Sequence, residues 1–292
     1  MLDSRVSCIF IDNNPDVVEQ WKIVYDLATK FFQSCTSASI HLNGTFVETT
    51  IESLLSSQAL CKGETAILTP TNSAAYMGAG FDRYLLEALL MTVNSPRIDY
   101  KTLERLIQEY TLEKYNGYLP ISTVNEIKLP QLAYPYHESL ARMNWNLTTV
   151  LAIPSMVVPE MLSEKEAKLV IVNSIWNLFL YLENSSPKNL IIPGIATGYG
   201  KLDPRIAAKL MLSTAIIYSS DFTGRDKRYS FLKKTVLLMF LLNKNYKNFE
   251  NVYDINELES HVLSDLGIIS ARSLCETSSH IYDIDELFTF VR

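Results

Sequence analysis

One stretch of the 292-residue sequence decides the fold: Asn72-Ser73-Ala74-Ala75-Tyr76-Met77-Gly78-Ala79-Gly80-Phe81-Asp82. An apolar run at residues 65–69 precedes it and predicts a strand, and a helical pattern at about residues 82–93 follows it. Gly78 and Gly80 allow the backbone to approach a ligand closely or to take positive φ. The free N–H groups of the following helix start favour an anion without any lysine. The loop therefore predicts a phosphate site, with a tight turn as the alternative explanation.

A second glycine-containing loop stands in the same position between a strand and a helix. The strand predicted at residues 189–192 runs into Pro193-Gly194-Ile195-Ala196-Thr197-Gly198-Tyr199-Gly200, and Asp203 with Pro204 begins the next helix. Tyr199 can stack on a sugar, or it can simply cover the end of the sheet. Ligands of open α/β sheets bind beyond the carboxyl ends of the strands. The two loops therefore predict one cleft for a diphosphate.

Strand and helix patterns alternate along the rest of the chain. Further strands are predicted at residues 6–11, 38–42, 122–128, 149–153 and 234–242. Further helices are predicted from Pro15 after the cap Asn14, at residues 50–57, at 99–115 after the cap Asp99, and from a capping box of Ser163 and Glu166 to about residue 183. This alternation predicts a three-layer α/β/α sandwich at residues 1–245. A helical C-terminal extension, residues 246–292, is expected to pack on it, with Asp254 and Asp283 as helix caps.

Composition narrows the classes of partner. The 26 basic and 32 acidic residues give a net charge of −6, and no basic stripe indicates binding of a nucleic-acid duplex. The longest apolar run, residues 236–242, is too short to span a bilayer, and the N-terminus lacks the apolar core of a signal peptide. The scattered Cys8, Cys35, Cys61 and Cys275 indicate neither a disulfide framework nor a metal site. We expect a cytoplasmic protein without a membrane partner, with the nucleus as an additional location.

Three other protein classes require residues that the sequence does not place where they are needed. The opening Ile9-Phe10-Ile11-Asp12-Asn13-Asn14 also resembles a response-regulator receiver domain, which requires an acidic pair there and an aspartate at the end of the third strand. That strand ends in Thr69-Pro70-Thr71-Asn72 instead. A Rossmann dinucleotide site requires glycines directly after the first strand, where none occur. A Ser-His-Asp hydrolase requires a histidine near a nucleophile, and of the four histidines only His137 is a candidate for the cleft.

The loop residues carry a more specific resemblance. The segments 69–73 and 78–82 resemble the macrodomain (A1pp-type) motif, an Asn-containing strand end followed by glycines and a hydrophobic–Asp pair. Residues 192–200 resemble the second phosphate loop of that family. Residues 152–159 resemble a strand and loop of a fungal and phage-type branch that includes ADP-ribose-1''-phosphate phosphatases. The resemblance covers about residues 5–245 well and the tail weakly.

The resemblance implies a macrodomain-like sandwich with a mixed central sheet that binds ADP-ribose or a derivative and needs no cofactor or metal. It implies that Asn72 lies at the distal ribose and that Asp82 orients or activates the water that attacks C1'' or its phosphate. These two are the expected catalytic residues. The expected ligand-binding residues are Asp12, Ser73, Gly78, Ala79, Gly80, Phe81, Ala196, Thr197, Gly198, Tyr199 and Gly200.

Departures from the family pattern affect mainly the adenine end of the expected site. Met77 and Ala79 stand where glycine is common in the family. The family often carries an acid for the adenine amino group soon after its second strand, and residues 43–46 contain none. Asp12 is the substitute candidate, although the sequence favours a role as partner of Asn14 and Pro15 at the start of the helix.

Two function classes remain open. The first is a hydrolase acting at the 1'' position, and the leading expectation is a phosphatase for ADP-ribose 1''-phosphate. Removal of ADP-ribose from a protein carboxylate requires the same geometry, so the sequence does not separate the two substrates. The second is a module that only binds ADP-ribose or ADP-ribosylated proteins. The carboxylate of Asp82 at the motif position favours the enzyme.

Overall fold

The structure is a computed structural model that describes residues 6–34, 38–58, 63–92, 98–185, 187–222 and 227–242, with the single positions 244, 262 and 266. The chain divides into two compact units, which are described separately. Unit 1 comprises residues 1–19 and 43–208, and unit 2 comprises residues 20–42 and 209–292. The predicted helix caps Asp254 and Asp283 lie outside the described residues, and the domain boundary predicted at residue 245 stays a prediction.

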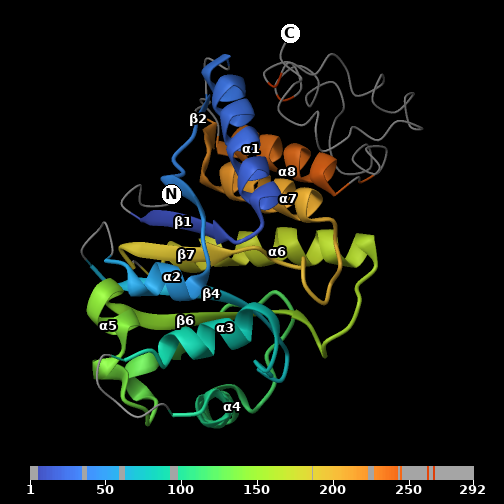
Figure 1. The fold of residues 1–292 in the computed structure, drawn as a ribbon. Coiled ribbons are helices and arrows are strands. Elements are labelled where there is room, and N and C mark those ends of the chain that lie inside the picture. Colours follow the sequence, from blue (N-terminus) through green and yellow to red (C-terminus); the bar gives the residue numbers. More distant parts are fainter. Residues whose placement is uncertain are drawn as a thin grey trace. The chain divides into compact units, whose positions relative to one another are not determined.

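Six strands form one sheet in unit 1: β1 (Ser7–Asp12), β3 (Gly44–Glu48), β4 (Thr65–Asn72), β5 (Asn125–Lys128), β6 (Leu147–Met156) and β7 (Asn189–Pro193). Their order across the sheet is β3-β1-β7-β4-β6-β5. Figure 1 labels β1, β7, β4 and β6, the four central strands of this order. All neighbours are parallel except β5, which pairs with β6 in antiparallel orientation. The predicted mixed sheet is therefore confirmed, and the parallel strands bring their carboxyl ends to one edge.

Helices cover both faces of this sheet. The helices α2 (Ile51–Ser56), α3 (Gly80–Leu89), α4 (Tyr100–Tyr115) and α5 (Leu140–Trp145) lie on one face, with two 3-10 turns, η1 (Leu129–Gln131) and η2 (Tyr136–Glu138). Helix α6 (Glu164–Leu182) packs on β6. Consecutive strand residues face opposite sides. Ile67 therefore joins the core under α2, α3 and α5, whereas the equally buried Leu68 points to the other face. The three-layer arrangement follows from this alternation.

Unit 2 contains most of two helices that begin in unit 1, α1 (Pro15–Ser34) and α7 (Pro204–Ser219), together with α8 (Lys227–Leu241). It also contains a small antiparallel pair, β2 (Ala38–Ser39) and β8 (Asp221–Phe222). Within the described residues, no helix has the length and apolar character needed to cross a membrane.

Two strand predictions were wrong. The strand predicted at residues 234–242 is wrong, because residues 234–241 belong to α8, where the buried Leu232, Val236, Leu237 and Leu241 follow a helical period rather than an alternation. The strand predicted at residues 38–42 shrinks to the two residues of β2, and β3 was not predicted at all. As an edge strand with no fully buried residue, β3 lacks the apolar signal that identified the central strands.

Candidate functional site

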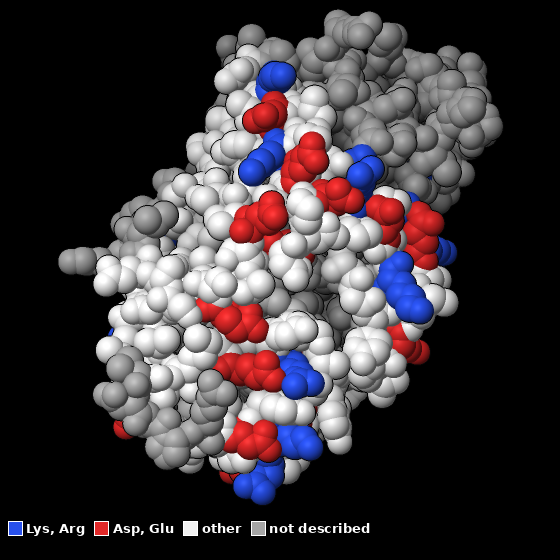
Figure 2. Space-filling view, in the orientation of Figure 1, with Lys and Arg blue, Asp and Glu red and all other residues white. Residues whose placement is uncertain are grey.

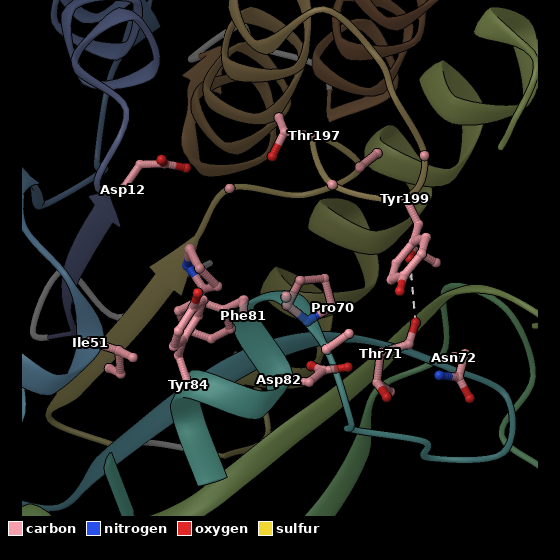
Figure 3. Close-up of a pocket in the computed structure, with 18 of the residues that line it drawn as sticks. Asp12, Ile51, Pro70, Thr71, Asn72, Phe81, Asp82, Tyr84, Thr197 and Tyr199 are labelled. Atoms are coloured by element: carbon pink, nitrogen blue, oxygen red, sulfur yellow. Dashed lines mark hydrogen bonds between the residues drawn. The ribbon is translucent and has the colours of Figure 1, made fainter. Parts of the chain in front are cut away.

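A cavity of about 700 Å³ lies in unit 1 at the carboxyl ends of β1, β4, β6 and β7. Its size suits a nucleotide-sized ligand, for which pockets typically span roughly 300–1,000 Å³. Figure 3 shows Asp12 on one side, Thr71, Asn72 and Asp82 on another, and Thr197 with Tyr199 on the loop that faces them. The walls are formed by residues 11–13, 49–52, 70–72, 76, 78–82, 84, 155–156, 159, 193–194 and 196–200.

The structure brings nearly all of the predicted site residues around this one cavity. The residues that line it are Asn72 and Asp82, together with Asp12, Gly78, Ala79, Gly80, Phe81, Ala196, Thr197, Gly198, Tyr199 and Gly200. Ser73 does not line the cavity. It is 2% exposed and its N–H donates to the Met156 carbonyl over 3.0 Å, so it joins the loop to β6 instead of facing a ligand.

Helix α3, which follows the first loop, has no N-cap side chain. Helices α2, α4 and α6 begin at Thr50, Asp99 and Ser163, whose side chains accept backbone N–H bonds of the first turn. Helix α3 begins after Ala79, which offers no side-chain acceptor. In the described structure, the N–H groups of residues 78–81 have no protein acceptor. Uncapped N–H groups at the positive end of a helix form a binding site for an anion.

The second loop adds a further row of N–H groups. Two backbone bonds hold its shape, from Lys201 N–H to the Gly198 carbonyl over 3.1 Å and from Leu202 N–H to the Ala196 carbonyl over 3.1 Å. The N–H groups of residues 197–200 have no acceptor in the part of the chain that the structure describes. Successive free N–H groups in a loop attract an anion by their partial charges. The cavity is thus bordered by two sets of unpaired donors.

The Asn72 side chain stabilises the first loop through hydrogen bonds to its backbone. Its Oδ1 accepts the N–H groups of Ala74 and Tyr76 over 3.2 and 3.1 Å, and its Nδ2 donates to the Tyr76 carbonyl over 2.7 Å. The side chain therefore holds a turn in which Ala75 takes a φ of 52°. This structural role was not evident from sequence, and the predicted contact of Asn72 with a ribose stays a prediction.

Glu104 of α4 was missed because it is far away in sequence. Its carboxylate accepts the N–H of Met77 over 2.6 Å and so fixes the loop just before its glycines. No local sequence signal connects a residue in the middle of one helix to a loop 27 positions earlier.

Asp82 occupies the first turn of α3 and is 7% exposed. The hydroxyl of Thr69 on β4 donates to its Oδ1. Burial raises the pKa of the Asp82 carboxyl to about 7, and the negative charge of Glu104 adds to this increase. The hydroxyl groups of Thr69 and Thr71 act in the opposite direction and lower the pKa. The carboxyl can therefore gain and lose a proton near neutral pH.

This raised pKa predicts a pH-dependent effect on stability. The ordinary value is 3.8, so the unfolded chain releases the proton first and the free energy of unfolding falls as the pH rises towards 7. The loss amounts to at most roughly 4 kcal/mol, at about 1.4 kcal/mol per pKa unit. Asp82→Asn keeps the acceptor for Thr69 without the charge. We expect its stabilising effect, measured by chemical unfolding, to grow from about pH 4 to about pH 7 and then level off. A difference from wild type that does not change with pH would contradict the raised pKa.

The opposite side of the cavity carries two further acids. The Asp12 carboxylate accepts the N–H of Asn14 over 2.8 Å and lies so close to Gly194 that a Cβ there would meet its Oδ2 at 2.4 Å. Burial raises the pKa of Asp12, while backbone N–H groups of Asn14, Asn13 and Gly194 lower it. Asp12 thus serves the start of α1, fixes the backbone at Gly194 and lines the cavity.

The residues that follow β3 are not those that the sequence analysis expected after its second strand. Residues 44–46, taken from sequence to follow a strand, lie inside β3. The residues that follow β3 and line the cavity are 49–52, and they include the half-buried acid Glu52. The apparent lack of an acid here came from the missed strand.

The cavity contains no cationic side chain. Its lining residues, all of which the structure describes, include the acids Asp12, Glu52 and Asp82 but no Lys, Arg or His. On the side of the molecule drawn in Figure 2, Lys and Arg are interspersed with Asp and Glu and form no basic field. Arg83 pairs with Glu87 over 2.9 Å, for example. An anionic ligand here would be held by backbone N–H groups and neutral side-chain donors, without a cationic side chain.

Comparison with known proteins gives weak structural matches and one extensive family match. The Oceanobacillus iheyensis macrodomain with MES bound is 16% identical, covers 60% of this chain and 84% of its own, and has a TM-score of 0.38. A glycine-to-valine mutant of that macrodomain with ADPR is 16% identical, covers 60% and 86%, and has a TM-score of 0.39. The family model described as Macro-like domain matches residues 5–274, most of the sequence, and the chain therefore belongs to the Macro-like domain family.

Proposed function

We propose that this protein binds ADP-ribose in the cavity of unit 1 and hydrolyses the bond at the 1'' position of an ADP-ribosylated substrate. One observation carries the proposal: two rows of unpaired N–H groups border a cavity that also holds a buried carboxyl titrating near neutral pH. The chain belongs to the Macro-like domain family, and both of its loops resemble the phosphate loops of ADP-ribose-binding macrodomains, which supports the choice of ligand.

The layout of the cavity supports an orientation for the ligand. The acids Asp12 and Glu52 lie by the ends of β1 and β3, whereas Asn72 and Asp82 lie by the end of β4. The diphosphate would lie between the two glycine loops, since these carry the unpaired N–H groups. The adenine would then lie towards Asp12, and C1'' of the distal ribose towards Asp82.

Asp82 would act as the general base. Its carboxylate takes a proton from a water molecule, the water oxygen forms a bond to C1'', and the bond from C1'' to the leaving oxygen breaks. The leaving oxygen then receives the proton from Asp82. A pKa of about 7 suits this exchange, because the carboxyl is substantially ionised at neutral pH yet basic enough to accept a proton. The loop N–H groups hold the diphosphate and fix C1'' in place.

The charge of the cavity favours an ADP-ribosylated protein as the substrate. ADP-ribose 1''-phosphate would bring up to two additional negative charges next to Asp82, with no Lys or Arg in the lining to offset them. A bond to a protein side chain brings none. A module that binds without turnover is the second candidate, because the N–H groups alone are sufficient to hold a diphosphate.

A paired assay tests this choice. Wild-type protein is incubated with a protein mono-ADP-ribosylated on an acidic side chain and, separately, with ADP-ribose 1''-phosphate. We expect release of ADP-ribose from the first at least about ten times faster than release of phosphate from the second, because unbalanced charge disfavours the phosphate ester. Faster phosphate release would identify a phosphatase instead. No product from either substrate, with ADP-ribose binding intact, would leave the binding module.

A further inference from the structure

An apolar surface lies next to the cavity. Fourteen large hydrophobic side chains are exposed in the described part of the chain, and six of them occupy three short segments. We call these six the rim surface: Tyr76, Tyr118, Ile121, Val157, Val158 and Met161. Met161 is 70% exposed and Tyr76 63%. Single exposed apolar residues are normal, but a group of them marks an interaction site.

Backbone hydrogen bonds hold the three segments side by side. The N–H of Ser73 donates to the Met156 carbonyl over 3.0 Å, which joins the loop before Tyr76 to the segment that contains Val157. The N–H of Leu119 donates to the Ser73 carbonyl over 2.9 Å, which adds the segment with Tyr118. The grouping is therefore a property of the fold and not only of the sequence.

The rim surface is continuous with the cavity at its reactive end. Tyr76 belongs to both, and Met156 and Pro159, on either side of Val157 and Val158, line the cavity. Asn72 pairs with Met156 at the end of the sheet, and Asp82 is bonded to the same strand β4. A group attached to the ligand next to Asp82 would therefore leave the cavity over these side chains.

The charge of the surface identifies the kind of partner. Residues 73–76, 118–122 and 156–161 contain one charged side chain, Glu160, and no Lys or Arg. Anionic membrane surfaces and nucleic acids are bound through Lys and Arg. Exposed Tyr and Met beside a few polar groups are typical of contacts with a polypeptide.

We infer that the rim surface binds the polypeptide segment that surrounds the ADP-ribosylated residue, and that it favours apolar side chains next to that residue. This inference rests on the proposed function, since it requires ADP-ribose in the cavity with C1'' towards Asp82. It extends that function by assigning the recognition of the protein part of the substrate to residues outside the cavity.

Two peptides that carry ADP-ribose through a non-hydrolysable linkage test the inference independently of turnover. One has Leu and Val around the modified residue, and the other has Gly and Ser. Wild-type protein is expected to bind the apolar peptide at least about ten times more tightly, as burial of two or three side chains would give. Val158→Glu and Met161→Glu should lose this preference and keep wild-type affinity for free ADP-ribose, because neither residue lines the cavity.

Met143→Glu is the matched control, since Met143 is 61% exposed on α5 and belongs neither to the rim surface nor to the cavity lining. It should change neither the preference for the apolar peptide nor the affinity for free ADP-ribose. Equal binding of the two peptides by wild-type protein would overturn the inference while free ADP-ribose still binds. Loss of affinity for free ADP-ribose in the rim variants would overturn it too. If wild-type protein self-associates through this surface and Met161→Glu is monomeric with the peptide preference intact, the surface is a contact between copies and the inference is wrong. Failure of free ADP-ribose to bind wild-type protein would instead refute the proposed function, and the inference with it.

Discussion

Asp82→Ala is expected to lower the turnover of an ADP-ribosylated protein at least about a hundredfold, within the roughly 10²–10⁴ that a general base contributes. Its affinity for ADP-ribose should stay close to that of wild type, because the N–H groups of the two loops hold the diphosphate. The separation of these two effects is informative, since loss of the fold would remove both. Initial rates and calorimetric titrations of the same preparations provide the measurement.

The pH dependence of kcat/KM is an independent test of the role of Asp82. The kcat/KM of wild-type protein should rise with pH and level off above about 7, the pKa to which burial raises the Asp82 carboxyl. Glu109→Ala, which removes an exposed carboxylate on α4, is the control and should show the wild-type profile. Full activity of Asp82→Ala would exclude Asp82 as the base.

Gly198→Val is expected to weaken ADP-ribose binding at least about a hundredfold, which corresponds to about 2.7 kcal/mol. Gly198 lines the cavity, and a Cβ built there meets no atom within 4 Å. The new side chain can therefore be accommodated in the empty protein but occupies space that the ligand needs. The unfolding midpoint should stay near that of wild type, so a binding defect would not reflect misfolding.

Gly80→Val tests the first loop, and it should differ from Gly198→Val in its effect on stability. A Cβ at residue 80 also meets no atom within 4 Å, but φ is +61°, a conformation that a β-branched residue adopts only with strain. This variant should lose both binding and some stability, whereas Gly198→Val loses binding alone. Unchanged affinity in both variants would show that the ligand does not lie against these loops.

Local signals made much of the fold predictable. The capping box of Ser163 and Glu166 and the cap of Asp99 stand where the sequence placed them. Central strands such as β4 and β7 were recognised because they contain continuous apolar runs, residues 66–68 and 190–193, and nearly all of their residues are buried. The edge strand β3 has no such signal. Assigning residues 234–242 to a strand failed because a continuous apolar run fits a buried helix equally well.

The candidate site was likewise predictable only where local sequence signals exist. Both glycine loops follow a strand and precede a helix, so their meeting at one sheet edge was predictable from strand direction. The contacts that shape them were not. Glu104 reaches Met77 from another helix, and Glu52 comes to the cavity after a strand that the sequence did not reveal. The assignment to a fungal branch of the family also stays a prediction.

A calorimetric titration of wild-type protein with ADP-ribose, with Gly198→Val as the matched variant, tests most directly whether this cavity binds ADP-ribose. Wild-type protein should show saturable binding at one site per chain, with a heat that is lost or strongly reduced in the variant. No saturable heat from wild-type protein at millimolar ADP-ribose, or equal binding by both proteins, would contradict the assignment of this cavity to ADP-ribose.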